Sequence, residues 1–117
     1  MNPLVLRGIA AHESNNNPKA VHRNKNGTVD YGMMQINSVN LKELNKYGIH
    51  RRDLMDECKS IYAGAFLLKQ KMVKHGNTTT AIGAYHSESP KERRRYAKLI
   101  QKQVEKIEAT QMMASND

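Results

Sequence analysis

The sequence of 117 residues has no tryptophan, one phenylalanine and one cysteine, Cys58. A lone cysteine excludes a disulfide within the chain. No apolar run of about eighteen residues occurs, which excludes a membrane-spanning helix. A chain of this length buries one modest core, so we expect a single domain.

Two further absences concern location and redox state. Residues 1–14 lack the basic start, the long apolar stretch and the small-residue cleavage site of a secretory signal. We therefore expect either a cytoplasmic protein or an export signal upstream of Met1. Cys58 also has two interpretations. It is a small buried residue or free thiol, or it pairs with a cysteine in a segment outside this sequence.

Positive charge, by contrast, is abundant: 19 Lys and Arg against 11 Asp and Glu give a net charge of +8. This charge favours a polyanionic partner, and nucleic acid, acidic lipid and the carboxylate-rich bacterial wall all qualify. We interpret the basic residues of the last third as the solvated face of an amphipathic core helix rather than as a nucleic-acid-binding helix. They are Lys91, Arg93, Arg94, Arg95, Lys98, Lys102 and Lys106.

Helical periodicity dominates the chain. Asn2 and Pro3 suit an N-cap and a first helical position, and the helix runs to about Ser14. Pro18, with the Ser and Asn residues before it, ends this helix. Further helices are predicted from Ser38 to Gly48, from about Cys58 to His75, from Thr78 to Tyr85 and from Pro90 onward. Residues 111–117 are predicted to be a flexible tail after a single domain of residues 1–110.

Residues 20–37 follow a different pattern. Asn26-Gly27 is a strong tight-turn signal. Val21 lies before it, and Val29 and Tyr31 lie after it. The pattern predicts a β-hairpin or a small three-stranded sheet. The predicted fold class is therefore mainly α, with a small β lobe inserted after the first helix.

Glu13 is the first candidate catalytic residue. It ends an apolar helix and precedes a segment that must turn sharply. A carboxyl half-buried at such a place loses solvation, so its pKa rises, as a general acid working near neutral pH requires. Taken alone, however, a Glu is more often an ordinary surface residue.

Four short motifs change that balance: Glu13-Ser14, Asn17-Pro18, Gly32-Met33-Met34-Gln35 and Ala84-Tyr85. In this order, within HESNNNPKAVHRN, GTVDYGMMQINS and the helix that follows, they resemble the active-site motifs of lysozyme-like lytic transglycosylases. The chain is most similar to the small ones that accompany secretion systems, conjugation machines and pili. The resemblance extends from about Leu4 to Ile107. It implies a groove for peptidoglycan glycan strands between helices and sheet, and neither cofactor nor metal.

The resemblance also implies roles for single residues. Glu13 would protonate the glycosidic oxygen between N-acetylmuramic acid and N-acetylglucosamine, then deprotonate the muramic 6-hydroxyl, which closes a 1,6-anhydro ring. Met34 and Gln35 would line the sugar groove. Tyr85 would orient Glu13. Ser14 would hold the local backbone or the bound sugar.

Asp30 keeps a second activity open. The segment GTVDYGMMQINS is also similar to the sheet segment of animal c-type lysozymes, where an Asp stabilises the oxocarbenium ion or attacks it. Glu13 and Asp30 would then be the two carboxylates of a glycosidase. Alternatively, Asp30 only accepts hydrogen bonds from hairpin amides. A hydrolytic lysozyme on the same scaffold therefore stays a possible function.

The chain departs from the family in one motif. The usual Ala-Tyr-Asn-x-Gly reads here Ala84-Tyr85-His86-Ser87-Glu88. His86 replaces Asn as a hydrogen-bond donor, makes substrate binding weakly pH-dependent, or is simply an exposed loop residue.

Other kinds of site find little support. The His residues and Cys58 show no metal-ligand spacing, and no phosphate-binding Gly loop occurs. The remaining alternative is a non-catalytic basic module that binds wall or nucleic acid, which predicts no role for Glu13. We expect a periplasmic enzyme whose partners are peptidoglycan and components of a secretion, conjugation or pilus apparatus, but not nucleic acid.

Overall fold

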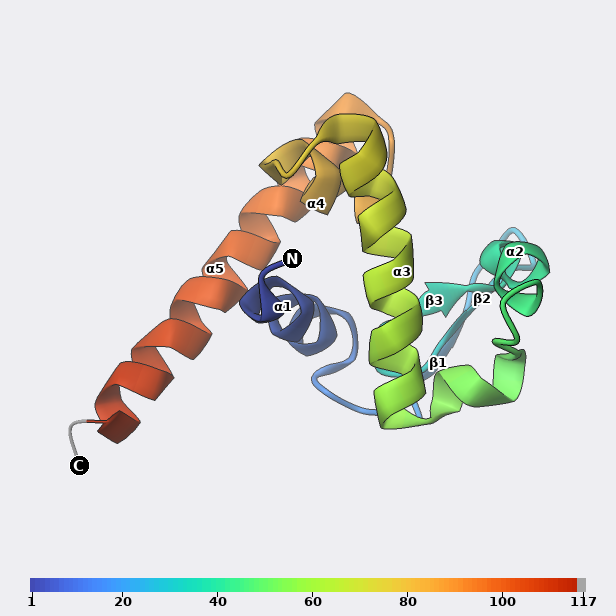
Figure 1. The fold of residues 1–117 in the computed structure, drawn as a ribbon, viewed down its shortest axis with the longest axis horizontal. Helices are drawn as coiled ribbons and strands as arrows, with labels where there is room; N and C mark the ends of the chain where they lie inside the picture. The colour runs from blue at the N-terminus through green and yellow to red at the C-terminus, as the bar shows by residue number, and fades with distance from the viewer. Residues whose placement is uncertain (116–117) are drawn as a thin grey trace.

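The computed structural model describes residues 1–115, which form several helices and one small sheet (Figure 1). In chain order the elements are α1 (Pro3–Ser14), β1 (Val21–Arg23), β2 (Val29–Tyr31), β3 (Ile36–Asn37), the 3-10 helix η1 (Ser38–Asn40), α2 (Leu41–Asn45), the 3-10 helix η2 (Arg51–Met55), α3 (Glu57–His75), α4 (Thr79–His86) and α5 (Pro90–Ser115). The predicted mainly α fold with a small β lobe is confirmed.

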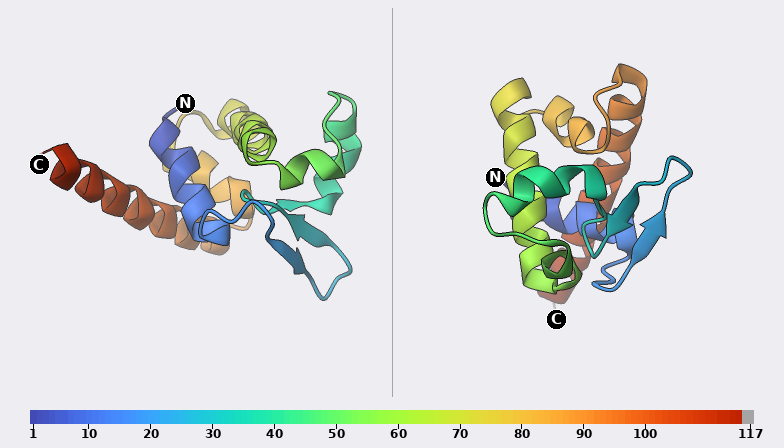
Figure 2. Two further views of the ribbon diagram at one scale, coloured as in Figure 1. Left: turned by 90° about the horizontal axis from the view of Figure 1, so that it is seen from below. Right: turned by 90° about the vertical axis from the view of Figure 1, so that its right-hand side faces the viewer.

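The sheet lies at one side of the helices, as the turned views in Figure 2 show. Its strands are antiparallel in the order β1-β2-β3. Asp30 occupies the middle of the central strand, opposite His22 on β1 and Asn37 on β3. The turn between β1 and β2 contains Gly27 with a φ of 88°, a left-handed conformation that glycine adopts without steric cost.

Helix α1 is capped at both ends by asparagine. The Asn2 side chain accepts a hydrogen bond from the Leu4 amide at 3.0 Å, and Pro3 begins the helix. Asn15 ends it in the left-handed conformation, and its amide donates to the carbonyls of the last turn. The chain therefore reverses directly after Glu13 and Ser14, as the sequence predicts.

The core lies where the long helices meet the loop between β2 and β3. Its fully buried side chains include Ile9 of α1, Met34 of the loop, Leu68 of α3 and Ile100 of α5. Gly64 makes room for Met34, because a Cβ there would lie 2.6 Å from the Met34 terminal methyl.

Two local predictions need correction, and one helix was missed. The helix predicted from Ser38 to Gly48 is a 3-10 turn followed by the short α2. Helix η2 was not predicted at all. The tail expected over 111–117 is helical as far as Ser115, because Gln, Met and Ala are good helix formers. Residues 116–117 lie outside the described part of the chain.

Two observations concern the sequence absences. Cys58 is an exposed free thiol in the first turn of α3, which removes the buried interpretation. Within residues 1–115, no helix is long and apolar enough to cross a membrane.

Candidate active site

A groove of about 980 Å³ runs between the sheet and the helices. It brings together side chains that are far apart in the sequence: Glu13 from the end of α1, Asp30 from β2, Gln35 from the loop before β3, and Tyr85 and His86 from the end of α4. Two other predicted site residues, Ser14 and Met34, do not line it.

Glu13 is partly buried in this groove. Burial raises the pKa of its carboxyl to about 7, and the negative charge of Asp30 contributes to the rise. At neutral pH a large fraction of Glu13 therefore carries a proton, as a general acid requires.

Asp30 is held in place by the sheet. Its Oδ1 accepts a hydrogen bond from Asn37 Nδ2 at 2.9 Å, and its Oδ2 accepts one from Asn24 Nδ2 at 3.1 Å. Both amides also donate to Thr28 Oγ1, at 3.0 and 3.2 Å. Asp30 thus accepts hydrogen bonds from side-chain amides of the sheet region. Its negative charge also acts on Glu13, whose pKa it raises.

The loop of residues 32–35 connects β2 and β3 and is hydrogen-bonded to helices on several sides. Ser14 of α1 donates from Oγ to the Met33 carbonyl at 2.7 Å. Tyr85 of α4 donates from its hydroxyl to the Met34 carbonyl at 3.1 Å. Ser60 of α3 accepts from the Met34 amide at 3.2 Å. Three helices therefore hold this loop through its backbone.

Gln35 stabilises the conformation of the same loop through its own side chain. Its backbone has a φ of 49°, in the left-handed region. Its side-chain amide donates to the carbonyls of Gly32, at 3.0 Å, and Ala20, at 3.2 Å. Gln35 lines the groove with its amide group already oriented.

The groove-lining role expected for Met34 is wrong. Its side chain is fully buried in the core beside Gly64, where an apolar side chain gains more than it would in a polar groove. Ser14 likewise does not line the groove. Its Oγ also accepts from the Asn17 amide at 3.1 Å, so of its two expected roles the structure supports holding the backbone.

Tyr85 lies close enough to both acids for their charges to act on it. Burial, then Glu13, then Asp30 raise the pKa of its phenol, so the ring stays neutral at any physiological pH. Its hydroxyl is therefore available as a hydrogen-bond donor, and the Met34 carbonyl accepts it.

His86 is exposed, as one interpretation expected, but it is the last residue of α4 and its ring has defined contacts. Its ring stacks on Tyr96 with centroids 4.8 Å apart and planes 10° from parallel, and its Nε2 lies 3.9 Å from a Glu92 oxygen. The ring of His12 also contacts the Tyr96 ring, edge to face, with centroids 5.5 Å apart. Burial, then the charges of His86 and Arg95, lower the pKa of His12.

Tyr96 lies on the buried face of α5, the helix predicted from Pro90 onward. Its hydroxyl is buried and has no hydrogen-bond partner within residues 1–115. Burial, then the charge of Glu13, raises its pKa. A tyrosine in the apolar stripe of α5 is the signal that could have identified it, since a buried hydroxyl usually has a polar neighbour.

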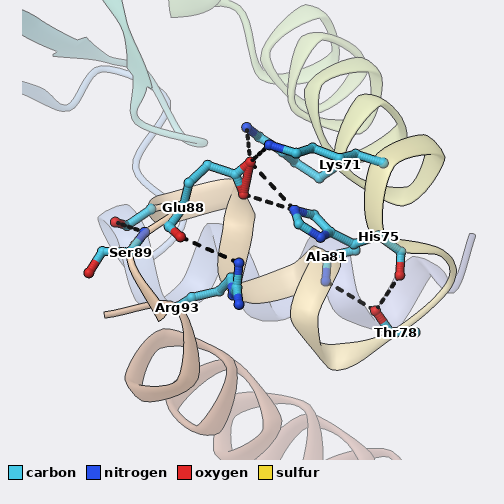
Figure 3. A network of polar contacts seen from close by, with 9 residues as sticks. Lys71, His75, Thr78, Ala81, Glu88, Ser89 and Arg93 are labelled. Carbon is cyan, nitrogen blue, oxygen red and sulfur yellow. Dashed lines mark hydrogen bonds and ion pairs between the residues drawn. The ribbon is translucent and has the colours of Figure 1, made fainter. Parts of the chain in front are cut away.

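Glu88, the second departure from the family pattern, fixes the connection between α4 and α5 (Figure 3). Its carboxylate binds Lys74, contacts His75 Nε2 at 2.9 Å and lies 3.7 Å from Lys71 Nζ. The hydrogen bonds from Lys74 and His75 lower its pKa to about 2. Because these partners belong to α3, the segment that carries His86 is tied to a second helix.

No cluster of metal-binding side chains occurs within residues 1–115. The chemistry that the arrangement supports is that of its two carboxyl groups. Glu13 is poised to give up a proton, and Asp30 faces it as a fixed negative charge. Two carboxyl groups that face one another in a groove are the arrangement that glycosidases use for acid–base catalysis.

Comparison with known proteins gives a consistent picture. The family model described as transglycosylase SLT domain matches residues 1–107. Invasion protein IagB of Salmonella typhimurium (strain SL1344) is 41% identical over 108 residues, covering 88% of this chain and 68% of that protein. Protein IpgF of Shigella flexneri is 37% identical over 110 residues, covering 90% and 72%. A peptidoglycan-binding-like protein of Escherichia coli O157:H7 is 33% identical over 110 residues, covering 84% and 66%.

Proposed function

Because the chain belongs to the transglycosylase SLT family, we propose that its groove binds a peptidoglycan strand and that Glu13 cleaves the β-1,4 bond between N-acetylmuramic acid and N-acetylglucosamine. The observation that carries this proposal is the position of Glu13, partly buried in the groove with a pKa of about 7. An acid in this state suits protonation of a poor leaving group near neutral pH.

The reaction begins with the protonated form of Glu13. Its proton passes to the glycosidic oxygen as the bond from that oxygen to the muramic C1 breaks. N-acetylglucosamine leaves with a free 4-hydroxyl, and positive charge develops at C1. Asp30, held by Asn24 and Asn37, stabilises this cation without having to reorient.

The second half of the reaction returns the proton. Glu13, now a carboxylate, takes the proton of the muramic 6-hydroxyl while that oxygen attacks C1. The product is a 1,6-anhydro end, Glu13 is protonated again, and no water is consumed. Tyr85 and the loop of residues 32–35 keep the wall of the groove in place during both halves.

A hydrolytic lysozyme is the second candidate function, and the position of Asp30 in the groove favours it. The two activities differ in their products, because hydrolysis adds one water to the cleaved end. Mass spectrometry of muropeptides released by the wild-type protein therefore tests the proposal. We expect anhydro ends, and predominantly reducing ends would assign the chain to the lysozymes.

The cellular role follows from the substrate. We propose a periplasmic location, because the proposed substrate, peptidoglycan, lies outside the inner membrane. The similarity to a protein named for invasion supports a role in opening the wall locally for a secretion, conjugation or pilus machine. Released muropeptides from cells with and without the assembled machine would show whether cleavage depends on it.

A further inference from the structure

The groove continues beyond Asp30 into a region that the proposed proton transfers do not use. The turn between β1 and β2 contributes Lys25 and Asn26 to the lining of the groove, and η1 contributes Val39 and Asn40. These four residues are here called the hairpin end of the groove. The turn projects beyond the helices in both views of Figure 2. At about 3.3 Å per residue along a strand, it lies about 7–10 Å from Asp30.

The hairpin end is joined to Asp30 through one asparagine side chain. Asn37 Nδ2 donates to Asp30 Oδ1 at 2.9 Å and to Thr28 Oγ1, at the end of the turn, at 3.0 Å. Asn37 Oδ1 accepts a hydrogen bond from the Val39 amide at 3.0 Å. A single amide group thus connects the turn, the carboxylate of Asp30 and η1. The hairpin end therefore has a defined position relative to Asp30.

Lys25 supplies positive charge to this part of the groove. Among the lysine and arginine residues of the described chain, it alone lines the groove. It is exposed and forms no ion pair within residues 1–115. The same groove contains the carboxyl groups of Glu13 and Asp30, whose negative charge disfavours an anionic substrate. Lys25 is placed to offset this repulsion at a fixed end of the groove.

Val39 adds an apolar surface to the hairpin end. Its side chain lines the groove although 69% of the residue is exposed. A neutral sugar offers mainly hydroxyl groups, which the amides of Asn26 and Asn40 suit better than a cation or a valine does. An exposed apolar side chain loses water-accessible area when a methyl group packs against it. Cation, amides and valine together therefore suit a peptide that carries both methyl groups and carboxylates.

We propose that the hairpin end of the groove is a subsite for the stem peptide of peptidoglycan, in which Lys25 binds a peptide carboxylate beside Val39. This inference rests on the proposed function for the identity of the polymer. In an intact strand the sugars are neutral, because the lactyl carboxyl of muramic acid forms the amide bond to the peptide. The carboxylates therefore lie on the peptide. The subsite favours strands that carry peptides over bare glycan, and it acts on binding rather than on the proton transfers of Glu13.

The test measures binding in a Glu13→Gln background, which prevents cleavage of the ligand. Lys25→Gln removes the charge at the hairpin end. Arg23→Gln is the matched control, because it removes the same charge from an exposed residue of the same hairpin that does not line the groove. Isothermal titration calorimetry compares three ligands of equal glycan length. They are a peptidoglycan tetrasaccharide with stem peptides, the same tetrasaccharide after amidase treatment, which leaves free lactyl carboxylates, and neutral chitotetraose.

We expect Lys25→Gln to bind the peptide-bearing tetrasaccharide about 5-fold more weakly than its parent, since an exposed charge pair contributes up to about 1 kcal/mol. High salt should remove most of this difference, because it screens exposed charges. Arg23→Gln should bind this ligand as its parent does. On the amidase-treated tetrasaccharide and on chitotetraose, Lys25→Gln should also match its parent, which would show that the groove itself is intact.

Equal losses in Lys25→Gln and Arg23→Gln would mean that only net charge matters and would overturn the proposal. So would an unchanged affinity of Lys25→Gln for the peptide-bearing ligand. An equal loss on the amidase-treated ligand would assign the contact to the lactyl carboxylate instead, and an equal loss on chitotetraose would assign it to the sugars. The proposed function fails separately, if the unmodified protein releases no muropeptides from the wall. Peptide-dependent binding through Lys25 in that case would leave a wall-binding module without catalysis.

Discussion

The raised pKa of Glu13 makes a prediction about stability as well as catalysis. Each tenfold difference between two ionisation constants corresponds to about 1.4 kcal/mol. A rise from 4.5 to about 7 therefore means that ionised Glu13 lowers the free energy of unfolding by about 3 kcal/mol. Glu13→Gln removes this cost while it keeps the shape of the side chain.

The sign of the effect depends on pH. Below pH 4.5 the carboxyl is protonated in both the folded and the unfolded chain, so Glu13→Gln should change stability little. Between pH 4.5 and about 7 the unfolded chain loses the proton first, and the wild type loses stability as pH rises. At pH 8 the variant should be more stable by about 3 kcal/mol, or about 10 °C in Tm.

Urea denaturation at pH 4 and pH 8 measures both values, and wall digestion provides the second readout. The more stable variant should be about 10²–10⁴-fold less active, because the amide cannot donate the proton. Glu108→Gln, on the exposed end of α5, is the matched control and should change neither quantity. The reasoning is refuted if Glu13→Gln is no more stable than the wild type at pH 8, or if it digests wall normally.

Four further predictions follow from single residues. Asp30→Asn should reduce the rate of wall cleavage severely, but less than Glu13→Gln does, and the product should stay mostly anhydro-muropeptide. An unchanged rate would mean that Asp30 serves only to accept hydrogen bonds within the hairpin. Gly32→Ala should destabilise the fold by at least about 2 kcal/mol in urea titrations, since its φ is 76° and a Cβ would overlap the Leu54 carbonyl; unchanged stability would contradict the packing. Tyr96→Phe should leave the free energy of unfolding unchanged or raise it by up to about 1 kcal/mol, because it removes a buried hydroxyl without a partner; a clear loss would reveal a bond to that hydroxyl. Cys58 should react fully with a thiol reagent in this chain, whereas protection in a longer, exported form would reveal an upstream partner.

The local part of the fold could be predicted from the sequence. The Asn2-Pro3 cap, the stop before Pro18 and the Asn26-Gly27 turn are signals contained within a few residues, and each has its predicted effect. The class of the fold follows from these signals, because a helix followed by a hairpin and more helices has few ways to bury its apolar faces.

Contacts between distant segments could not be predicted in the same way. The burial of Met34 depends on the absence of a side chain at Gly64, thirty positions away in the chain. The environment of Tyr96 depends on His12 and His86, which come from two other helices. Periodicity identifies an apolar face, but it does not tell which polar atom meets that face. The catalytic roles of Glu13 and Asp30 remain predictions for the experiments above.

The loop of residues 32–35 has a consequence for how the groove tolerates substitution. Ser14, Ser60 and Tyr85 bind this loop only through its carbonyls and amides. The side chains of Met33 and Met34 can therefore change to others of similar apolar volume without loss of a hydrogen bond, as Met34→Leu would, whereas Gln35 uses its side chain for two hydrogen bonds. The residues that hold the loop have no such freedom, because each contributes a hydroxyl that no apolar residue replaces. In a library of variants, we expect permissive positions at Met33 and Met34, and restrictive ones at Gly32, at Gln35 and on the three helices around the loop.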